Sequence, residues 1–332
     1  MKIAVISNGS FGTCLAQVLC ENNHDVTLWG RDIEYIAHVN KTRVNDRYLK
    51  AFILHSKLKL TADMAEAVDG VDFVLISTPT QYSRSSLELL AKQKLNNPLI
   101  VNVAKGIENN SLKRVSEITQ EILGNKHRYV DLAGPSHAEE IMQRIPTALV
   151  SASKSKEDAE LIQKAFMNEY IRVYTSSDVT GVELAGALKN IFAIAAGIVD
   201  GMKFGDNTKA ALMTRGIAEM ARLGRALGGE EATFNGLSGI GDLIVTCTSQ
   251  HSRNRFVGES LGKGQSMEDI QKSMGHSVAE GVKTTESAWQ LAQKYKVEAP
   301  IINEAYKVLY EGANPSEALM RLMGRDAKEE WY

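Results

Sequence analysis

The chain begins with an alternation of short apolar runs and longer amphipathic segments, which continues as far as residue 175. The runs have few polar interruptions, as expected of strands buried on both faces of a parallel sheet that helices cover. We expect strands at residues 2–6, 25–29, 73–76, 99–103, 129–132, 148–151 and 171–174, and helices at residues 12–21, 83–92, 111–123 and 156–168. This alternation predicts a doubly wound α/β domain with a parallel sheet.

Beyond residue 175 the strand pattern ends, and long helical patterns follow to the C-terminus. The connecting segment TSSDVTG offers Asp178 or a neighbouring serine as the N-cap of the first of these helices, because such side chains accept hydrogen bonds from free helical N–H groups. We therefore predict two domains, residues 1–177 with the sheet and residues 178–332 with helices alone.

Composition and charge narrow the class of protein. A chain of 332 residues is long enough for two domains that each bury a core. Its 38 Lys and Arg against 40 Asp and Glu give a net charge of −2, without a long run of either sign. This balance gives no reason to expect nucleic acid or an anionic membrane as a partner.

The cysteines and histidines indicate neither a disulfide framework nor a metal site. The three cysteines are far apart and form no CxxC pair, and the seven histidines show no metal-ligand spacing, so we expect no metal. The N-terminus lacks the pattern of a secretory leader, and we find no stretch apolar enough for long enough to span a bilayer. We therefore expect a cytoplasmic protein without stable membrane insertion.

The first strand–helix junction has the sequence SNGSFG, residues 7–12, with two of the three glycines of a dinucleotide-binding fingerprint. Gly9 would let the backbone approach a pyrophosphate and Gly12 would let helix and strand pack closely, whereas Ser7 stands in place of the tight-turn glycine. Backbone N–H groups and the helix dipole at such a junction can hold a pyrophosphate. An ordinary turn is the alternative, but the position in the first βαβ unit favours a Rossmann-type, NAD(P)-binding domain at residues 1–177. A serine in this turn is expected to have a positive φ, which costs about 1 kcal/mol or more.

The second expected strand ends in WGRD, where the ribose of the cofactor would lie. An acidic residue at this place accepts hydrogen bonds from the ribose of NAD, whereas an arginine accommodates the 2′-phosphate of NADP. Here Arg31 comes first and Asp32 follows. We expect that NADP(H) is at least tolerated; the alternative is that Arg31 is a solvated surface residue.

Residues 186–199 are apolar except for Lys189 and Asn190. A helix that is apolar on every side is buried, and burial lowers the pKa of a lysine until it can act as an acid or base near neutral pH. We favour catalysis by Lys189. The alternative is a structural salt bridge to a carboxylate such as Glu183 or Asp242.

Two glycine-rich polar stretches offer further candidates. NVAKGIE follows an expected strand and places Lys105 at the carboxyl edge of the sheet, where ligands bind in open α/β folds. GLSGIGDLIVTCTSQHSRNRF contains Asp242 and the trio Ser252, Arg253 and Asn254. An arginine flanked by hydroxyl and amide donors suits a phosphate or a carboxylate.

Seven motifs together, in order and spacing, resemble the bacterial NAD(P)-dependent glycerol-3-phosphate dehydrogenases. They are SNGSFGT, NVAKGIE, AGPSHAEE, ELAGALKNIFAIAAG, GLSGIGDLIVTC, SRNRFVG and VAEGVKT, and they span nearly the whole chain. The chain departs from the family at Ser7, where the family usually has glycine, followed by a small residue at the position of Asn8. This departure bears on cofactor affinity more than on the type of reaction. Phe11 stands where the family commonly has another aromatic residue, usually Trp or Tyr.

The resemblance implies that dihydroxyacetone phosphate and sn-glycerol 3-phosphate are interconverted with NADP(H) or NAD(H), at a site between the two domains. It also implies a homodimer and a product that feeds phospholipid synthesis. Lys189 would be the proton donor and acceptor, with Lys105 and Asp242 as further catalytic residues. The implied cofactor contacts are Gly9, Ser10, Phe11, Gly12, Arg31, Lys105, Ala138, Arg253, Val278 and Glu280. The implied substrate contacts are Lys105, Gly134, Ser136, Lys189, Asp242, Ser252, Arg253 and Asn254.

Two alternative functions stay open at this point. A related β-hydroxyacid dehydrogenase would share the domain order and a lysine on a helix, although the trio at residues 252–254 favours a phosphorylated substrate. A protein that only senses the dinucleotide would explain the missing glycine, but it would not need Lys189, Asp242 and Arg253.

Overall fold

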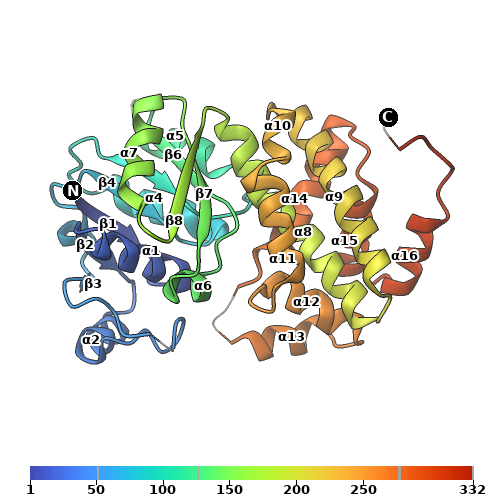
Figure 1. Ribbon diagram of the computed structural model, residues 1–332, viewed down its shortest axis with the longest axis horizontal. Helices are drawn as coiled ribbons and strands as arrows, with labels where there is room; N and C mark the ends of the chain where they lie inside the picture. The colour runs from blue at the N-terminus through green and yellow to red at the C-terminus, as the bar shows by residue number, and fades with distance from the viewer. Residues whose placement is uncertain (51, 126, 276–277, 331–332) are drawn as a thin grey trace.

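The computed structural model of the protein describes residues 1–50, 52–125, 127–275 and 278–330. A sheet with its covering helices forms the N-terminal part, and helices alone form the C-terminal part (Figure 1). The predicted α/β fold followed by a helical region is therefore confirmed.

The sheet has eight strands in the order β3-β2-β1-β4-β5-β6-β7-β8. Their bounds are β1 Lys2–Ile6, β2 Asp25–Trp29, β3 Lys59–Thr61, β4 Phe73–Ile76, β5 Leu99–Asn102, β6 Tyr129–Ala133, β7 Thr147–Ala152 and β8 Ile171–Ser176. Each of the seven expected strands forms. The sequence missed β3, and the expectation of a purely parallel sheet is wrong at β7, which runs antiparallel to β6. The strand order reverses beside β1, between β2 and β4, which is the place where open α/β sheets bind ligands.

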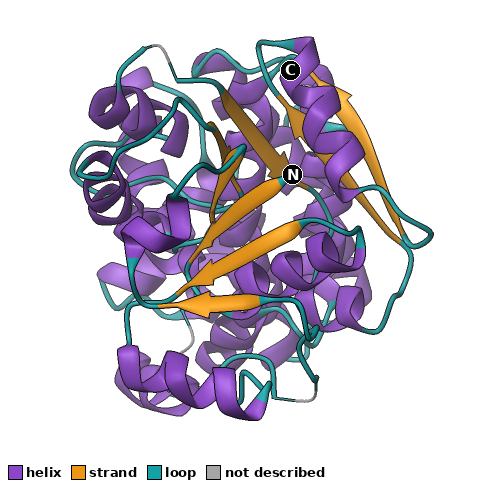
Figure 2. Ribbon diagram, turned by 90° about the vertical axis from the view of Figure 1, so that its left-hand side faces the viewer, coloured by secondary structure: helices purple, strands orange, loops and turns teal. Residues whose placement is uncertain are grey.

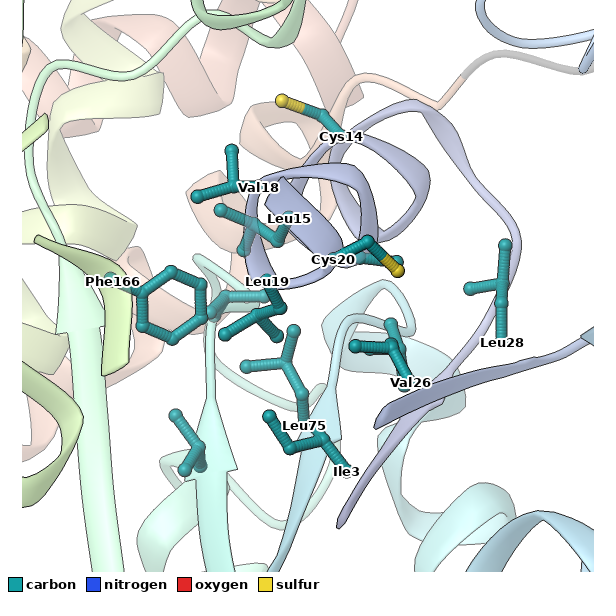
Figure 3. Close-up of a cluster of buried hydrophobic side chains, with 14 of the residues drawn as sticks. Ile3, Cys14, Leu15, Val18, Leu19, Cys20, Val26, Leu28, Leu75 and Phe166 are labelled. Carbon is teal, nitrogen blue, oxygen red and sulfur yellow. The ribbon is translucent and has the colours of Figure 1, made fainter. Parts of the chain in front are cut away.

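Helices cover both faces of the sheet (Figure 2). They are α1 Ser10–Glu21, α2 Ile33–Thr42, α3 Met64–Val68, α4 Thr80–Ala91, α5 Val115–Leu123, α6 Ala138–Met142 and α7 Lys156–Phe166. Successive residues of β1 enter different cores. Ile3 and Val5 pack with α1 and α7, whereas Ala4 and Ile6 pack with α3, α4 and α5. Figure 3 shows Ile3 with side chains of α1 and with Phe166 of α7. This division explains the unbroken apolar runs, because both faces of each central strand are buried.

The helical part is built around α8. Its helices are α8 Val179–Gly201, α9 Asp206–Ala226, α10 Glu231–Phe234, α11 Asp242–Thr248, α12 Arg253–Gly262, α13 Met267–Met274, α14 Glu280–Tyr295, α15 Pro300–Tyr310 and α16 Pro315–Met323, with a π-helical turn η1 Leu237–Gly241 before α11. Asp178 accepts a hydrogen bond from the Gly181 N–H at 2.8 Å and caps α8, so of the two kinds of N-cap that the sequence offered it is the aspartate that forms. The helices α9, α11, α12, α14 and α15 all pack on α8.

The expectation that no stretch is apolar enough to span a bilayer is wrong for α8. An 18-residue window of this helix has a mean hydropathy of 1.6, so by length and composition alone the helix could cross a membrane. In the structure 94% of that window is buried inside the protein, where the surrounding helices replace lipid. An apolar surface on every side therefore marks α8 as the core of the helical part.

Glycines bring α12 against α8 with no space for a side chain between them. A Cβ atom on Gly197 would overlap the Arg255 carbonyl, and one on Gly258 would overlap the backbone of Ile194. This close approach places the first residues of α12, Arg253 and Asn254, beside the middle of α8.

Candidate active site

A cleft of about 720 Å³ lies between the carboxyl edge of the sheet and the helical part. Residues of the first turn, of the loops after β4 and β5, and of α8, α11 and α12 line it. Of the residues singled out from the sequence, those that line this cleft are Gly9, Ser10, Phe11, Arg31, Lys105, Ser136, Ala138, Lys189, Asp242, Ser252, Arg253, Asn254, Val278 and Glu280. The fold thus gathers them at one place although they come from opposite ends of the chain.

The turn between β1 and α1 keeps the shape of a dinucleotide-binding turn. Ser7 has a φ of 96°, a value that glycine adopts easily and other residues rarely do. Gly12 does not line the cleft but lies beneath it, where a Cβ would overlap the Ser7 carbonyl and the Ser77 hydroxyl. At Gly9 a Cβ would meet only Ser7 Oγ, at 3.8 Å, so the backbone there is open to a ligand. The expectation of a positive φ at Ser7 is confirmed.

The two residues after β2 differ in their surroundings. Asp32 caps α2 by accepting a hydrogen bond from the Tyr35 N–H at 3.0 Å, and it pairs with Arg47 at 2.7 Å. Arg31 is exposed and lines the cleft. The carboxylate that could have accepted hydrogen bonds from a ribose is therefore already engaged, and the guanidinium is the group at the cleft.

One carboxylate holds two lysines at the centre of the cleft. Asp242 Oδ1 accepts a hydrogen bond from Lys189 Nζ at 2.8 Å, and Oδ2 accepts one from Lys105 Nζ at 2.7 Å. Lys189 is only 5% exposed and Asp242 only 1%. The salt bridge considered as an alternative role for Lys189 is thus present, with Asp242; Glu183 instead pairs with Arg114 at 2.7 Å.

Burial and charge set the protonation of this cluster. Burial lowers the pKa of Lys189 to about 8, with the Lys105 ammonium acting in the same direction and the Asp242 carboxylate in the opposite one. Burial acts to raise the pKa of Asp242, but the two ammonium groups outweigh it and hold that pKa below its ordinary value. Lys189 can therefore exchange a proton near neutral pH, while Asp242 stays ionised.

Thr246 belongs to the same cluster and was missed in the sequence. Its hydroxyl accepts a hydrogen bond from Lys189 Nζ at 2.6 Å and donates one to the Asp242 carbonyl, also at 2.6 Å. A lysine ammonium has three N–H groups, and two of them point to Asp242 and Thr246, which leaves the third for a ligand. The spacing of four residues after Asp242 was the available signal, because residues i and i+4 share one face of a helix.

The trio at the start of α12 has three different roles in the structure. Ser252 Oγ caps α12 by accepting a hydrogen bond from the Arg255 N–H at 3.1 Å. Arg253 Nη2 reaches across the cleft and donates to Ser10 Oγ at 2.9 Å. Asn254 is buried and donates to Asn190 Oδ1 at 2.9 Å, so its amide joins α12 to α8.

The remaining candidates surround Lys105 and the start of α14. Lys105 Nζ donates to the Gly134 carbonyl at 2.9 Å and lies 3.5 Å from Ser136 Oγ. Gly134 thus touches the site through its carbonyl and, like Gly12, does not line the cleft. Glu280 accepts a hydrogen bond from the Thr80 N–H at 2.8 Å, and burial raises its pKa. In the part of the chain that the structure describes, no group of three or more His, Cys, Asp or Glu side chains could hold a metal ion.

Two family models match the chain, and between them they cover most of it. Residues 2–159 match the N-terminus of NAD-dependent glycerol-3-phosphate dehydrogenase and residues 178–320 match its C-terminus. A glycerol-3-phosphate dehydrogenase [NAD(P)+] of Thermoanaerobacter sp. (strain X514) is 50% identical over 332 residues, which is 100% of this chain and 99% of that protein. The corresponding protein of Staphylococcus haemolyticus is 48% identical over 334 residues, 99% of each chain.

Comparison with solved structures gives the same family. The crystal structure of glycerol-3-phosphate dehydrogenase from Coxiella burnetii has a TM-score of 0.93 and 35% identity, and the match covers 97% of this chain and 98% of that one. A ketopantoate reductase from Ralstonia eutropha, at 15% identity and a TM-score of 0.61, shares the fold alone. The chain belongs to the family of NAD-dependent glycerol-3-phosphate dehydrogenases.

Proposed function

We propose that this protein interconverts dihydroxyacetone phosphate and sn-glycerol 3-phosphate with NADP(H) or NAD(H). The observation that carries the proposal is the Lys189–Asp242–Lys105 cluster, which lies in the same cleft as a turn shaped for a dinucleotide. Family membership and 50% identity to a dehydrogenase of this specificity support it.

Gly9 and the first N–H groups of α1 would hold the pyrophosphate of the cofactor, since α1 begins there with no side-chain cap on those groups. The bound cofactor supplies or accepts the hydride. Lys189 supplies the proton: in reduction its free N–H donates to the C2 oxygen as negative charge develops there, and in oxidation the neutral amine takes the proton of the C2 hydroxyl. A pKa of about 8 lets the same group act in both directions.

Asp242 positions both lysines, and its negative charge offsets the repulsion between them. Two ammonium groups against one carboxylate leave one positive charge in this cluster, and Arg253 adds another at the start of α12. This surplus suits a phosphate dianion, which we place near Arg253 and Ser252, with the C2 carbonyl toward Lys189 and Lys105. Asn254 acts by holding α12 against α8, because its amide groups already have partners in Asn190 and the Gly281 N–H.

The decisive experiment measures NADPH and NADH oxidation with dihydroxyacetone phosphate, and with a β-keto acid as the control substrate. We expect oxidation with the phosphate only. Activity with the control alone would indicate the β-hydroxyacid dehydrogenase alternative, and dinucleotide binding without turnover by the folded protein would indicate the sensor alternative.

Replacement of the proposed proton donor tests the mechanism separately. Lys189→Ala should lower kcat by at least about 100-fold, the usual scale of acid–base catalysis, with little change in the Kd of NADPH. Near-normal turnover would place the proton donor elsewhere.

We also propose the domain boundary and the biological setting that the sequence and the family resemblance indicated. The boundary between the two domains lies between residues 177 and 178, where β8 has ended and Asp178 caps α8.

The protein acts as a cytoplasmic homodimer without a nucleic acid partner or stable membrane insertion, and its product feeds phospholipid synthesis. Light scattering of the purified protein tests the dimer.

A further inference from the structure

The backbone on both sides of Lys105 is held by side chains that the mechanism above does not use. Asn102, the last residue of β5, accepts a hydrogen bond from the Ala104 N–H at 3.1 Å and donates one to the Ala104 carbonyl at 3.0 Å. The carbonyl of Lys105 itself accepts a hydrogen bond from Asn190 at 3.0 Å. The two peptide groups that flank the Cα atom of Lys105 are therefore fixed, although this segment belongs to neither a strand nor a helix.

Asn102 is in turn held from the neighbouring strand. It pairs with Asp131 in the register of β5 and β6, and its amide donates to Asp131 Oδ1 at 2.6 Å. Asn102 is fully buried and Asp131 is 3% exposed, between Val130 and Leu132 in the core. Among the described residues, Asp131 has no ion-pair partner within 4.0 Å.

A carboxyl group in such a place is costly unless it serves a hydrogen bond. Burial, and secondarily the Glu183 carboxylate, raise the pKa of Asp131 well above its ordinary value. The hydrogen bond from Asn102 and the positive charges of Lys105 and Arg114 act in the opposite direction. In the structure the carboxyl group is the acceptor for the Asn102 amide. An apolar residue would fill the same core position at lower cost, so the hydrogen bond accounts for the acid.

We propose that the buried pair Asp131–Asn102 is a positioning device for Lys105. The pair fixes the backbone of residues 103–105 and thereby sets the direction of the Lys105 side chain. In this direction Nζ reaches both Asp242 and the Gly134 carbonyl. The proposal rests on the role assigned to Lys105 in the reaction. Positioning of this kind matters because displacement of a reacting group by about 1 Å can cost about 100-fold in rate.

The test compares Asn102→Ala, Lys105→Met and the double variant in the reduction of dihydroxyacetone phosphate. We expect Asn102→Ala to lower kcat/KM by about 10-fold or more, while the Kd of NADPH changes by less than about twofold. If Asn102 acts through Lys105, the double variant is no worse than Lys105→Met. Losses that multiply in the double variant would overturn the proposal, because Asn102 would then act by another route.

Two replacements of Asp131 separate a hydrogen bond from a charge. Asp131→Asn keeps an oxygen for Asn102 and should retain most of kcat/KM, whereas Asp131→Val removes the acceptor and should resemble Asn102→Ala. Wild-type kinetics in Asp131→Val, or equal losses in both variants, would overturn the proposal.

Ser151→Ala is the matched control for the loss of a buried hydrogen bond. Ser151 lies in the same sheet, is fully buried, and donates to the Ala159 carbonyl at 2.9 Å. Its side-chain hydrogen bond thus goes to α7 and not to residues 103–105. This variant should lower the Tm and leave kcat/KM unchanged. A loss of kcat/KM in Ser151→Ala as large as that in Asn102→Ala would show a general effect of stability and overturn the proposal. Normal kinetics in Lys105→Met would overturn both this proposal and the role of Lys105. In that case, turnover of dihydroxyacetone phosphate by the wild-type protein would still support the proposed enzyme activity.

Discussion

The protonation of Lys189 leads to a quantitative pH profile. With a pKa of about 8, about nine-tenths of Lys189 carries its proton at pH 7 and about one-tenth at pH 9. In the proposed mechanism, reduction needs the ammonium form of Lys189 and oxidation needs its amine form. Between pH 7 and pH 9, kcat/KM for dihydroxyacetone phosphate should therefore fall about tenfold, and kcat/KM for glycerol 3-phosphate should rise by a similar factor.

The Asp242→Asn variant tests the electrostatic cause of that profile. The carboxylate 2.8 Å from Lys189 Nζ raises the pKa of the lysine against the effect of burial. An opposite charge at this distance shifts a pKa by about 1 to 3 units, so its removal should move the midpoint of the reduction profile to between about pH 5 and pH 7. At pH 7 half or more of the variant's Lys189 would then lack the proton that reduction needs.

The assay follows NADPH absorbance under kcat/KM conditions from pH 5 to pH 10, with the Kd of NADPH measured at each pH as the control. A wild-type profile that is flat from pH 7 to pH 9 would refute the assignment of the proton to Lys189. An unchanged midpoint in Asp242→Asn would refute the role of the carboxylate in setting it.

Three further predictions concern the turn, the ribose end of the cleft and a buried carboxyl. Ser7→Gly should leave the free energy of unfolding unchanged or raise it by up to about 1 kcal/mol, and hold or improve NADPH affinity, because glycine adopts a φ of 96° without strain. Much weaker NADPH binding, measured by titration, would show that the hydroxyl is itself a contact. Arg31→Gln should weaken NADPH more than NADH, since only NADPH has a 2′-phosphate; equal changes in the two Kd values would contradict a role for Arg31 in that preference. Burial raises the pKa of Glu219 from 4.5 to about 7, so the folded state holds this proton more tightly than the unfolded chain, and the free energy of unfolding should decline by up to about 3 kcal/mol from pH 4.5 to pH 7. Urea titrations of Glu219→Gln should show a smaller decline, and an equally steep one would indicate another group.

Most of the sheet could be predicted from local pattern because a strand buried on both faces needs an unbroken apolar run. The strand β3 could not, since it has three residues at the edge of the sheet, KLT, with one charged side chain exposed. The antiparallel direction of β7 was also out of reach. Strand direction depends on how the chain returns to the sheet, which the short helix α6 decides and the composition of Thr147–Ala152 does not.

The candidate site was predictable as a set of residues but not as an arrangement. Lys189 is visible in the sequence because a charge in an apolar helix is conspicuous. Its contact with Asp242 spans 53 positions and that of Lys105 spans 137, and no local pattern encodes such distances. Asn254 shows the same limit, since its amide could have faced a phosphate and instead joins two helices.

The contact of α8 with α12 also sets how close the two helix backbones can come. Lys189 lies on one of these helices and Arg253 begins the other, and the backbones already touch at Gly197 and Gly258. Closer packing is impossible, and any side chain at either glycine would push the helices apart. Backbone atoms therefore set the smallest possible separation between α8, which carries Lys189, and α12, which begins at Arg253. Substitution of either glycine can increase this separation, and no change of side chain at these positions can decrease it.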